Sequence, residues 1–229
     1  MKDILGQALH DYYYNNKPTD LWIHNQYGPK EEMPVDIFFR DETNMPELEL
    51  TALKLCRGKV LDIGAGAGSH ALYLQHHGLD VKALDVSGTG VSVMKARGVN
   101  DALETDIFAF TDKKYDTLLM LMNGIGLAGT LANLRVFLVH AKTLLKPGGQ
   151  LLFDSSDIAY LYDETALPTD KYYGELWYQY EYKNQRTEWF NWLYIDKETL
   201  SAIAKEEGWL TEIILEDEYD QYLVRLILG

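Results

Sequence analysis

The sequence of 229 residues contains one cysteine, six prolines and no long apolar run. Because Cys56 is the only cysteine, a disulfide framework and a cluster of thiolate metal ligands are both excluded. No apolar stretch reaches about 18 residues, so we expect no membrane-spanning helix. The first 16 residues carry one basic residue, Lys2, and no apolar core before Asp11, so we expect no secretory signal. The sequence therefore predicts a cytoplasmic protein.

The charge of the chain is strongly negative and unevenly distributed. The net charge is −14, yet residues 46–153 carry 10 acidic and 11 basic side chains and are close to neutral. Residues 1–45 carry 8 acidic and 4 basic side chains, and residues 154–229 carry 17 and 6. A negative field repels a phosphate backbone, so we expect no nucleic-acid partner and favour a small molecule as the substrate.

Aromatic residues gather in the same acidic parts of the chain. Residues 1–45 and 154–194 hold 19 of the 28 aromatic side chains. A neutral, glycine-rich middle between acidic, aromatic flanks is typical of a cofactor-binding scaffold with a cap that faces the substrate. The core of an ordinary hairpin would also gather aromatic residues.

The middle of the chain alternates between short apolar strands and helices. Nearly continuous apolar strands in this pattern predict a parallel sheet that is covered on both faces. Pro147, Gly148 and Gly149 predict a turn before the fifth strand. Residues 1–43 show no regular pattern. The expected helices are 44–57, 69–77, 90–97 and 130–145, and the expected strands are 59–63, 80–85, 99–105, 115–122 and 150–154.

The pattern changes after Ser155. Two aromatic, roughly alternating runs predict a β-hairpin, and a helix and two more strands follow. Too little chain separates the last two strands for a crossover, so they must be antiparallel. The expected elements are a hairpin of residues 174–182 and 187–195 around 183–185, a helix from 196 to 207, and strands at 209–215 and 221–228.

Together these elements predict an α/β fold with a doubly wound, seven-stranded, mostly parallel sheet whose last strand is antiparallel. We expect residues 1–45 to form an N-terminal cap and residues 46–229 to form the main domain. Residues 172–195 are expected to be a hairpin inserted into that domain.

A glycine-rich turn lies where the first strand of the sheet meets a helix, in the sequence Val60-Leu61-Asp62-Ile63-Gly64-Ala65-Gly66-Ala67-Gly68. Glycines allow a backbone to approach a ligand closely, and doubly wound sheets bind ligands at this edge. A dinucleotide site is the rival interpretation. The spacing argues against it, because Ser69 stands where the third glycine of the dinucleotide motif would fall. Asp62 would also repel a pyrophosphate, whereas it suits a ligand that carries an ammonium group.

With four further motifs in the expected order, the chain resembles the class I S-adenosylmethionine-dependent methyltransferases, closely over residues 46–154. The motifs are Asp85 at the end of the second strand, Asp106 after the third, residues 115–119 in the fourth and residues 144–149 before the fifth. The resemblance implies S-adenosyl-L-methionine as the cofactor and S-adenosyl-L-homocysteine as the product. The cofactor-binding residues that it implies are Asp62, Gly64, Ala65, Gly66, Gly68, Asp85, Val86, Asp106, Ile107 and Met122.

By this resemblance Asp85 binds the two ribose hydroxyls and Asp106 contacts the adenine amino group. Each acid also has an ordinary structural interpretation. Asp62 can accept hydrogen bonds within the turn, Asp85 can cap the next helix, and Asp106 is of a residue type that is common in loops. Arg40 is expected either to pair with the methionyl carboxylate of the cofactor or to be a surface arginine.

In this family the residues after the fourth strand face the methyl group. Here Asn123 is the candidate catalytic residue, because its amide can orient a substrate, although it can also belong to a plain turn. The segment departs from the Asn/Asp-Pro-Pro-Tyr pattern of methyltransferases that act on nucleic-acid amino groups. The candidate substrate-binding residues are His24 and Tyr14 in the cap, and Asp154, which either holds a cationic substrate or caps its strand. No histidine spacing matches a metal site, so we expect no metal.

The sequence thus predicts methyl transfer from S-adenosylmethionine to a cationic or neutral small-molecule acceptor, by in-line displacement with catalysis mainly through positioning. Two other functions stay open. One is a non-catalytic S-adenosylmethionine-binding sensor or partner subunit, and the other, less favoured, is an NAD(P)-dependent oxidoreductase. We expect a monomer or a homodimer, and no membrane partner.

Overall fold

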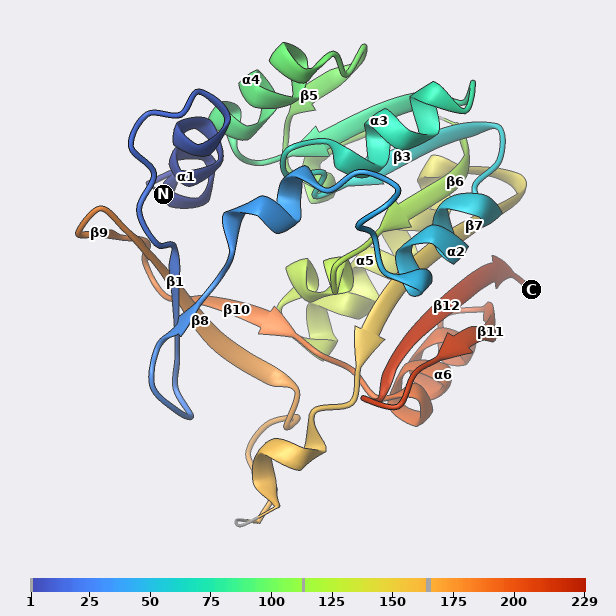
Figure 1. Cartoon of the computed structure of the whole chain (residues 1–229). Helices are drawn as coiled ribbons and strands as arrows, with labels where there is room; N and C mark the ends of the chain where they lie inside the picture. Colours follow the sequence, from blue (N-terminus) through green and yellow to red (C-terminus); the bar gives the residue numbers. More distant parts are fainter. Residues whose placement is uncertain (1, 113, 164–165) are drawn as a thin grey trace. The chain divides into compact units, whose positions relative to one another are not determined.

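The computed structural model describes residues 2–112, 114–163 and 166–229 (Figure 1). The described strands form two sheets. The strands of the larger sheet are β3 (Lys59–Ile63), β4 (Asp80–Asp85), β5 (Ala102–Glu104), β6 (Tyr115–Met120), β7 (Leu145–Ser156), β11 (Trp209–Glu216) and β12 (Gln221–Leu228). The helices that follow or precede them are α2 (Glu47–Leu55), α3 (Ser69–His76), α4 (Gly88–Arg97), α5 (Leu131–Leu144) and α6 (Lys197–Glu206), with the 3-10 turns η2 (Ile107–Ala109), η3 (Gly124–Ala128) and η4 (Ala159–Tyr162).

The order of the larger sheet is β11-β12-β7-β6-β3-β4-β5. β4 and β5 are parallel, as are β6 and β7, whereas β12 is antiparallel to both of its neighbours, β7 and β11. The predicted fold class is therefore confirmed. The chain divides into two compact units: unit 1 comprises Met1–Pro46, Leu61–Phe110 and Trp177–Phe190, and unit 2 comprises Glu47–Val60, Thr111–Leu176 and Asn191–Gly229. The expected boundary at residue 45 stays a prediction.

Local sequence signals explain most of these elements. Leu118, Leu119 and Met120 are fully buried in β6, in keeping with a strand covered on both faces. Ser87 caps α4 by accepting a hydrogen bond from the Gly90 N–H at 2.7 Å. The left-handed backbone that ends this helix is supplied by a glycine, Gly98.

The predicted turn at Pro147–Gly149 is part of β7 itself. β7 begins beside Tyr115, which pairs with Leu145, but the next pair is Thr117 with Gln150. The extra residues of β7 form a bulge, which lets the strand continue through the insertion. The strand therefore begins earlier than the sequence pattern predicts.

The N-terminal segment is more regular than its sequence suggests, and the prediction of an irregular segment was wrong. It contains α1 (Ile4–Tyr13), β1 (Trp22–Asn25), β2 (Glu31–Glu32) and the 3-10 helix η1 (Val35–Phe39). Asp3 caps α1 by accepting a hydrogen bond from the Gly6 N–H. The apolar side of α1 is buried in a cluster of unit 1 that comprises Ile4, Ala8, Leu9, Leu21, Val35, Ala67, Val93 and Tyr182.

The aromatic hairpin forms, and it is joined by the N-terminal strand. The hairpin strands are β8 (Glu175–Tyr182) and β10 (Phe190–Leu193), and the short β9 (Gln185–Arg186) also pairs with β8. With the N-terminal strands they form the smaller sheet, in the order β10-β8-β1-β2. Lys183 and Asn184 form the tight turn with positive φ angles of 47° and 60°. β1 pairs antiparallel with β8, with Trp22 opposite Glu181. No local signal in the sequence predicts this long-range pairing.

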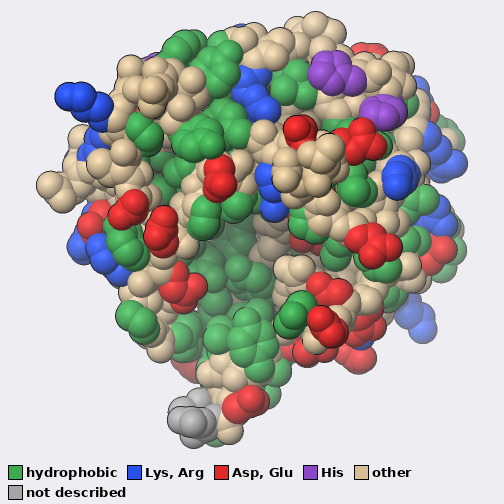
Figure 2. Space-filling model, viewed as in Figure 1, with side chains coloured by type: hydrophobic (Ala, Val, Ile, Leu, Met, Phe, Trp, Pro, Cys, Tyr) green, Lys and Arg blue, Asp and Glu red, His purple; other side chains and the backbone are tan. Residues whose placement is uncertain are grey.

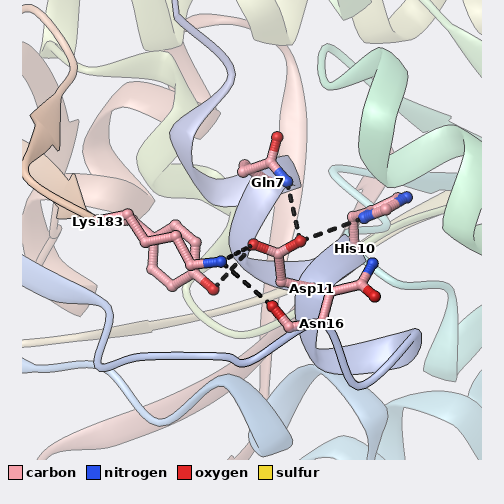
Figure 3. Close-up of polar contacts among 6 residues, drawn as sticks. Gln7, His10, Asp11, Asn16 and Lys183 are labelled. Atoms are coloured by element: carbon pink, nitrogen blue, oxygen red, sulfur yellow. Dashed lines mark hydrogen bonds and ion pairs between the residues drawn. The ribbon is translucent and has the colours of Figure 1, made fainter.

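One buried acid connects α1 to the hairpin turn (Figure 3). Asp11 is 5% exposed and accepts hydrogen bonds from Gln7 Nε2 at 3.0 Å, Tyr182 Oη at 3.2 Å and Lys183 Nζ at 2.7 Å. Burial by itself would raise the pKa of Asp11, but the hydrogen bonds, with Lys183 first, hold it below the usual value of 3.8. Lys183 also donates to the backbone oxygen of Asn16. α1 and the turn are therefore held by a charge-assisted network.

We expect Asp11→Ala to lower the free energy of unfolding by about 1–3 kcal/mol, because Tyr182 and Lys183 lose a buried acceptor. Urea unfolding followed by circular dichroism measures this. Because the folded-state pKa of Asp11 is lowered, its contribution is present above the ordinary pKa and is lost as the pH falls through the folded value. The difference in the free energy of unfolding between wild type and variant should therefore become smaller below about pH 4. Asp36→Ala, at an exposed acid of η1, is the control and should change little; equal losses in both variants would contradict the prediction.

Candidate functional site

The glycine-rich turn after β3 is fixed by hydrogen bonds to the neighbouring strand. The backbone N–H groups of Gly64 and Ala65 both donate to the backbone oxygen of Leu84, at 2.9 Å each. Gly66 and Gly68 have φ angles of +57° and +85°, which residues other than glycine rarely adopt. A Cβ atom on Gly68 would also lie 2.8 Å from Cγ2 of Val99. The turn therefore requires glycine at these two positions.

Asp62 lies in β3 directly below this turn and is 1% exposed. Among the residues that the structure describes, no group donates a hydrogen bond to its Oδ2 atom. Burial raises the pKa of Asp62 to about 6, although the charge of His70 and the Ala71 N–H oppose the shift. A buried carboxylate oxygen without a donor is costly, so the site favours a ligand that brings a cationic donor to it.

Asp85 lies at the end of β4 and is oriented by two backbone groups. Its Oδ2 accepts a hydrogen bond from the Gly66 N–H and its Oδ1 accepts one from the Ser87 N–H, both at 2.8 Å. Burial raises the pKa of Asp85, and these two hydrogen bonds oppose the shift. A carboxylate oxygen can accept more than one hydrogen bond, so both oxygens remain able to accept from hydroxyl groups. Asp85 thus serves the turn and is available to a ligand.

The adjacent edge of unit 1 presents apolar surface beside an acid. Val86, directly after Asp85, is 71% exposed, whereas Ile107 is 4% exposed. Asp106 caps η2, and its Oδ1 accepts a hydrogen bond from the Phe108 N–H at 2.9 Å. The ends of β4 and β5 are joined by a hydrogen bond from the Thr105 N–H to the Asp85 backbone oxygen. An exposed aliphatic side chain at such an edge is suited to cover the flat face of a base.

The N-terminal segment covers the turn, through residues that sequence reasoning did not select. A Cβ atom on Gly66 would lie 3.3 Å from Cδ1 of Phe38. Ser69 Oγ donates a hydrogen bond to the backbone oxygen of Phe38 at 2.7 Å, and Arg97 donates to that of Ala67 at 2.6 Å. Arg97 has only a weak signal in the sequence, because a cation in the last turn of a helix is ordinarily explained by the helix dipole.

The other cap residues occupy different places in unit 1. Arg40 is half-buried and directly follows η1. His24 lies in β1, with Nε2 2.8 Å from Oε2 of Glu181. Because His24 pairs with Gln179, it projects from the face of the smaller sheet opposite to Tyr180. Tyr14 follows α1, is 50% exposed, and its ring lies 4.7 Å from that of His10. Their expected roles stay predictions.

The candidate acceptor residues belong to unit 2, after β6. Met122 and Asn123 have consecutive positive φ angles of 62° and 53°. The Asn123 N–H donates to Asp154 Oδ2 at 2.8 Å, and its Nδ2 donates to the Leu193 backbone oxygen at 3.1 Å. The Ser155 hydroxyl donates to Asn123 Oδ1 at 3.1 Å. Backbone strain held by a buried polar network is a feature of functional sites.

Two tyrosines lie near the end of β7 in the same unit. Tyr172 donates to Asp196 Oδ2 at 2.6 Å, and Tyr173 donates to Asp157 Oδ1 at 2.7 Å. Burial and these carboxylates raise the pKa of both hydroxyls well above 10. Both tyrosines are therefore protonated at neutral pH and act as hydrogen-bond donors, not as bases. Within the described ranges, no group of three or more His, Cys, Asp or Glu side chains is placed to hold a metal ion.

Comparison with known proteins identifies the family. Residues 38–211 match the family described as a methyltransferase domain. A solved S-adenosylmethionine-dependent methyltransferase from Bacteroides fragilis, in complex with S-adenosyl-L-homocysteine, is 42% identical to this chain. The similarity covers 100% of this chain and 95% of that one, with a TM-score of 0.92. The chain belongs to the class I S-adenosylmethionine-dependent methyltransferases. The expected family and its cofactor are confirmed, and the oxidoreductase interpretation has no support.

Two further comparisons are weaker. A methyltransferase from Clostridium acetobutylicum shares the fold with a TM-score of 0.60, over 82% of this chain and 94% of that one, at 14% identity. The demethylmenaquinone methyltransferase of Tropheryma whipplei is 29% identical over 99 residues, which is 41% of this chain and 40% of that protein. The match therefore spans about two fifths of that relative's length.

Asp62→Asn should weaken the binding of S-adenosylhomocysteine at least tenfold, because it removes the buried anion that we expect to face the ammonium group of the ligand. The same variant should be more stable than wild type at pH 7, by roughly 3 kcal/mol, because burying the charged carboxylate is costly. Between about pH 4 and 6 the folded protein holds a proton that the unfolded chain has released, so wild-type stability falls as the pH rises. The pKa of about 6 sets this window. Calorimetry and urea unfolding at several pH values measure both effects; unchanged affinity in the variant would sink the assignment.

Asp85→Ala is expected to weaken S-adenosylhomocysteine binding by about 1–3 kcal/mol, through the loss of an acceptor for ligand hydroxyls. Asp80→Ala is the matched control, because Asp80 is an exposed acid at the other end of β4. Isothermal calorimetry of both variants separates the local effect from a general change in charge. Equal affinities of the two variants would refute the role of Asp85.

Proposed function

We propose that this protein transfers the methyl group of S-adenosylmethionine to a cationic or neutral small-molecule acceptor. The observation that carries the proposal is the buried carboxylate of Asp62, whose Oδ2 has no donor among the described residues, at the base of a turn that requires glycine. Such a site suits a ligand with an ammonium group and excludes a pyrophosphate. Asp85 is oriented in the same unit by two N–H groups and suits a ribose diol.

The proposed work of the chain is to bind and to orient. When bound, S-adenosylmethionine would supply a methyl group on a sulfonium, from which a nucleophile can take it by in-line attack at the methyl carbon because the C–S bond breaks to release a neutral thioether. Asp62 binds the ammonium group, Asp85 binds the ribose, and Val86 and Ile107 cover the adenine, with Asp106 at its edge. Holding two reactants in the right geometry supplies much of the acceleration of such a step. A base is needed only if the acceptor atom must lose a proton before it can attack.

On the acceptor side, Asn123 is proposed as the residue that orients the substrate. Its Oδ1 and one of its two Nδ2 hydrogens are held by Ser155 and Leu193, so among the described residues one N–H is left for a ligand. Asp154 fixes the backbone of Asn123 and adds negative charge. A donor held this rigidly can position an acceptor without a large loss of side-chain entropy.

The charge of the protein favours a cationic or neutral acceptor. The net charge is −14, and acidic side chains are spread over the face drawn in Figure 2. Asp154, Asp157 and Asp196 lie at or near the end of β7 or at the start of α6. An anionic polymer would meet repulsion here. The match to demethylmenaquinone methyltransferase extends over too little of either chain to transfer its acceptor to this protein.

The proposal is tested with S-adenosylmethionine labelled in the methyl group, incubated with the protein and panels of amines, phenols and thiols. Parallel reactions contain DNA, RNA or a cell protein extract. Label is expected in a low-molecular-weight, cationic or neutral acceptor. With that acceptor, Asn123→Ala should lower kcat about tenfold or more, with S-adenosylhomocysteine affinity nearly unchanged.

Two outcomes contradict the proposal. Label recovered in nucleic acid or protein alone would replace the small-molecule acceptor by a macromolecule. Tight S-adenosylhomocysteine binding without transfer to any acceptor would favour the non-catalytic sensor or partner subunit.

A further inference from the structure

The guanidinium of Arg97, the last residue of α4, reaches the glycine-rich turn. Its Nη1 donates hydrogen bonds to the Ala67 backbone oxygen at 2.6 Å, to Ser69 Oγ at 3.2 Å and to the Phe38 backbone oxygen at 3.4 Å. The first two acceptors belong to the turn and to the start of α3, and the third belongs to η1. One cation thus connects the cofactor turn with the N-terminal segment.

The segment that Arg97 holds lies directly on the turn. The Phe38 ring packs over Gly66, which is buried although it has no side chain. Ser69 Oγ donates to the Phe38 backbone oxygen at 2.7 Å, so η1 is fastened to the turn by a second hydrogen bond. η1 is therefore held against the turn by the Phe38 ring and by this hydrogen bond.

Aromatic residues of the cap complete the surroundings of Arg97. Its guanidinium carbon lies 4.9 Å from the centre of the Phe39 ring, within the range of a cation–π contact. The Phe39 ring in turn packs against Tyr12 at 4.7 Å and Tyr13 at 6.3 Å. The Tyr13 hydroxyl donates to the Ala96 backbone oxygen at 3.1 Å. α1 and η1 thus converge on the C-terminal end of α4.

α1 also contacts the opposite end of α4, beside Asp85. Asp3 Oδ2 accepts hydrogen bonds from Ser87 Oγ at 2.8 Å and from the Thr89 N–H at 3.1 Å. The α1 segment is therefore fixed to both ends of α4. Because η1 packs against α1 through Phe39, these contacts also restrict the position of η1.

An arginine is better suited than a lysine to this position. Burial lowers the pKa of Arg97, but an arginine side chain starts so far above neutrality that it stays charged at pH 7. The planar guanidinium donates to several oxygens while its face packs on an aromatic ring. The compact ammonium of a lysine cannot make both kinds of contact in the same way. A neutral side chain would leave the Ala67 carbonyl without this donor.

We propose that Arg97 is a positioning residue for the cofactor. By holding the carbonyl of Ala67 and the backbone of Phe38 together, it fixes the conformation of residues 64–69 and keeps η1 closed over them. The inference rests on the proposed assignment of this turn to the cofactor, and it adds that binding requires a contact made by a residue on a different helix.

The test compares Arg97→Met with Lys95→Met, which removes an exposed cation from the same last turn of α4. Binding of S-adenosylhomocysteine is measured by calorimetry, and backbone opening by hydrogen exchange of residues 36–40 and 64–69. Arg97→Met is expected to bind at least tenfold more weakly and to exchange faster in both segments. Lys95→Met should bind within about twofold of wild type, and Arg97→Lys should lie between the two.

A purely structural role for Arg97 gives a different result. In that case the melting temperature of Arg97→Met falls while its affinity equals that of wild type, which overturns the proposal. Equal losses of affinity in Arg97→Met and Lys95→Met also overturn it, because they indicate a general effect of charge.

A second variant keeps the test open if Arg97→Met does not fold. Ser69→Ala removes one acceptor of Arg97 and the hydrogen bond to Phe38, and it should weaken binding severalfold with faster exchange in residues 36–40. Wild-type behaviour of this variant in both measurements would overturn the proposal. If wild-type protein fails to bind S-adenosylhomocysteine, the cofactor site itself is wrong; if wild type binds and Arg97→Met binds equally well, only the role of Arg97 is wrong.

Discussion

The proposed cofactor site depends on a carboxylate that is buried and that, among the described residues, has no donor for one of its oxygens. Burial raises the pKa of Asp62 to about 6, so at neutral pH the folded chain carries a charged group in a place that favours the neutral form. The surrounding backbone is fixed by Leu84, which accepts from Gly64 and Ala65, and by Asp85, which accepts from Gly66. A rigid frame prevents the acid from relaxing toward solvent. If Asp62 binds the cofactor as proposed, binding specificity is obtained at the expense of some stability.

Features with a local cause could be predicted from the sequence. The apolar run of β6 predicted a covered strand, and the positive φ angles of Gly66 and Gly68 agree with a turn that only glycine can form easily. The acids proposed for the cofactor site could be selected because Asp62 and Asp85 lie within strands of the sheet and Asp106 comes two residues after one. Helix α1 was missed because it has only 10 residues and Gly6 lies in its first turn, although Asp3 caps it. The pairing of β1 with β8 joins segments far apart in the chain, and no local pattern encodes it.

The same distinction holds within the site. Arg97 and Phe38 act on the turn from other elements, so their contacts depend on tertiary packing that a motif does not contain. The residues proposed for the acceptor have still less local signal. Asn123 has a strained backbone conformation because Asp154, Ser155 and Leu193 hold it there, and these partners come from distant parts of the chain. Sequence can therefore select a cofactor more readily than an acceptor, since the residues proposed to bind the acceptor are brought together only by folding.

The position of β12 has a consequence for biosynthesis. β12 follows α6 and β11 along the chain but fills the place between β11 and β7, antiparallel to both. Until β12 leaves the ribosome, one edge of β7 is unpaired. β11 then also lacks β12, the strand with which it pairs in the folded sheet. An open edge of this kind is a ready template for pairing with another nascent chain. The exposure lasts for the whole time in which the hairpin and α6 are made, so this period of translation is the one in which chaperone protection matters most.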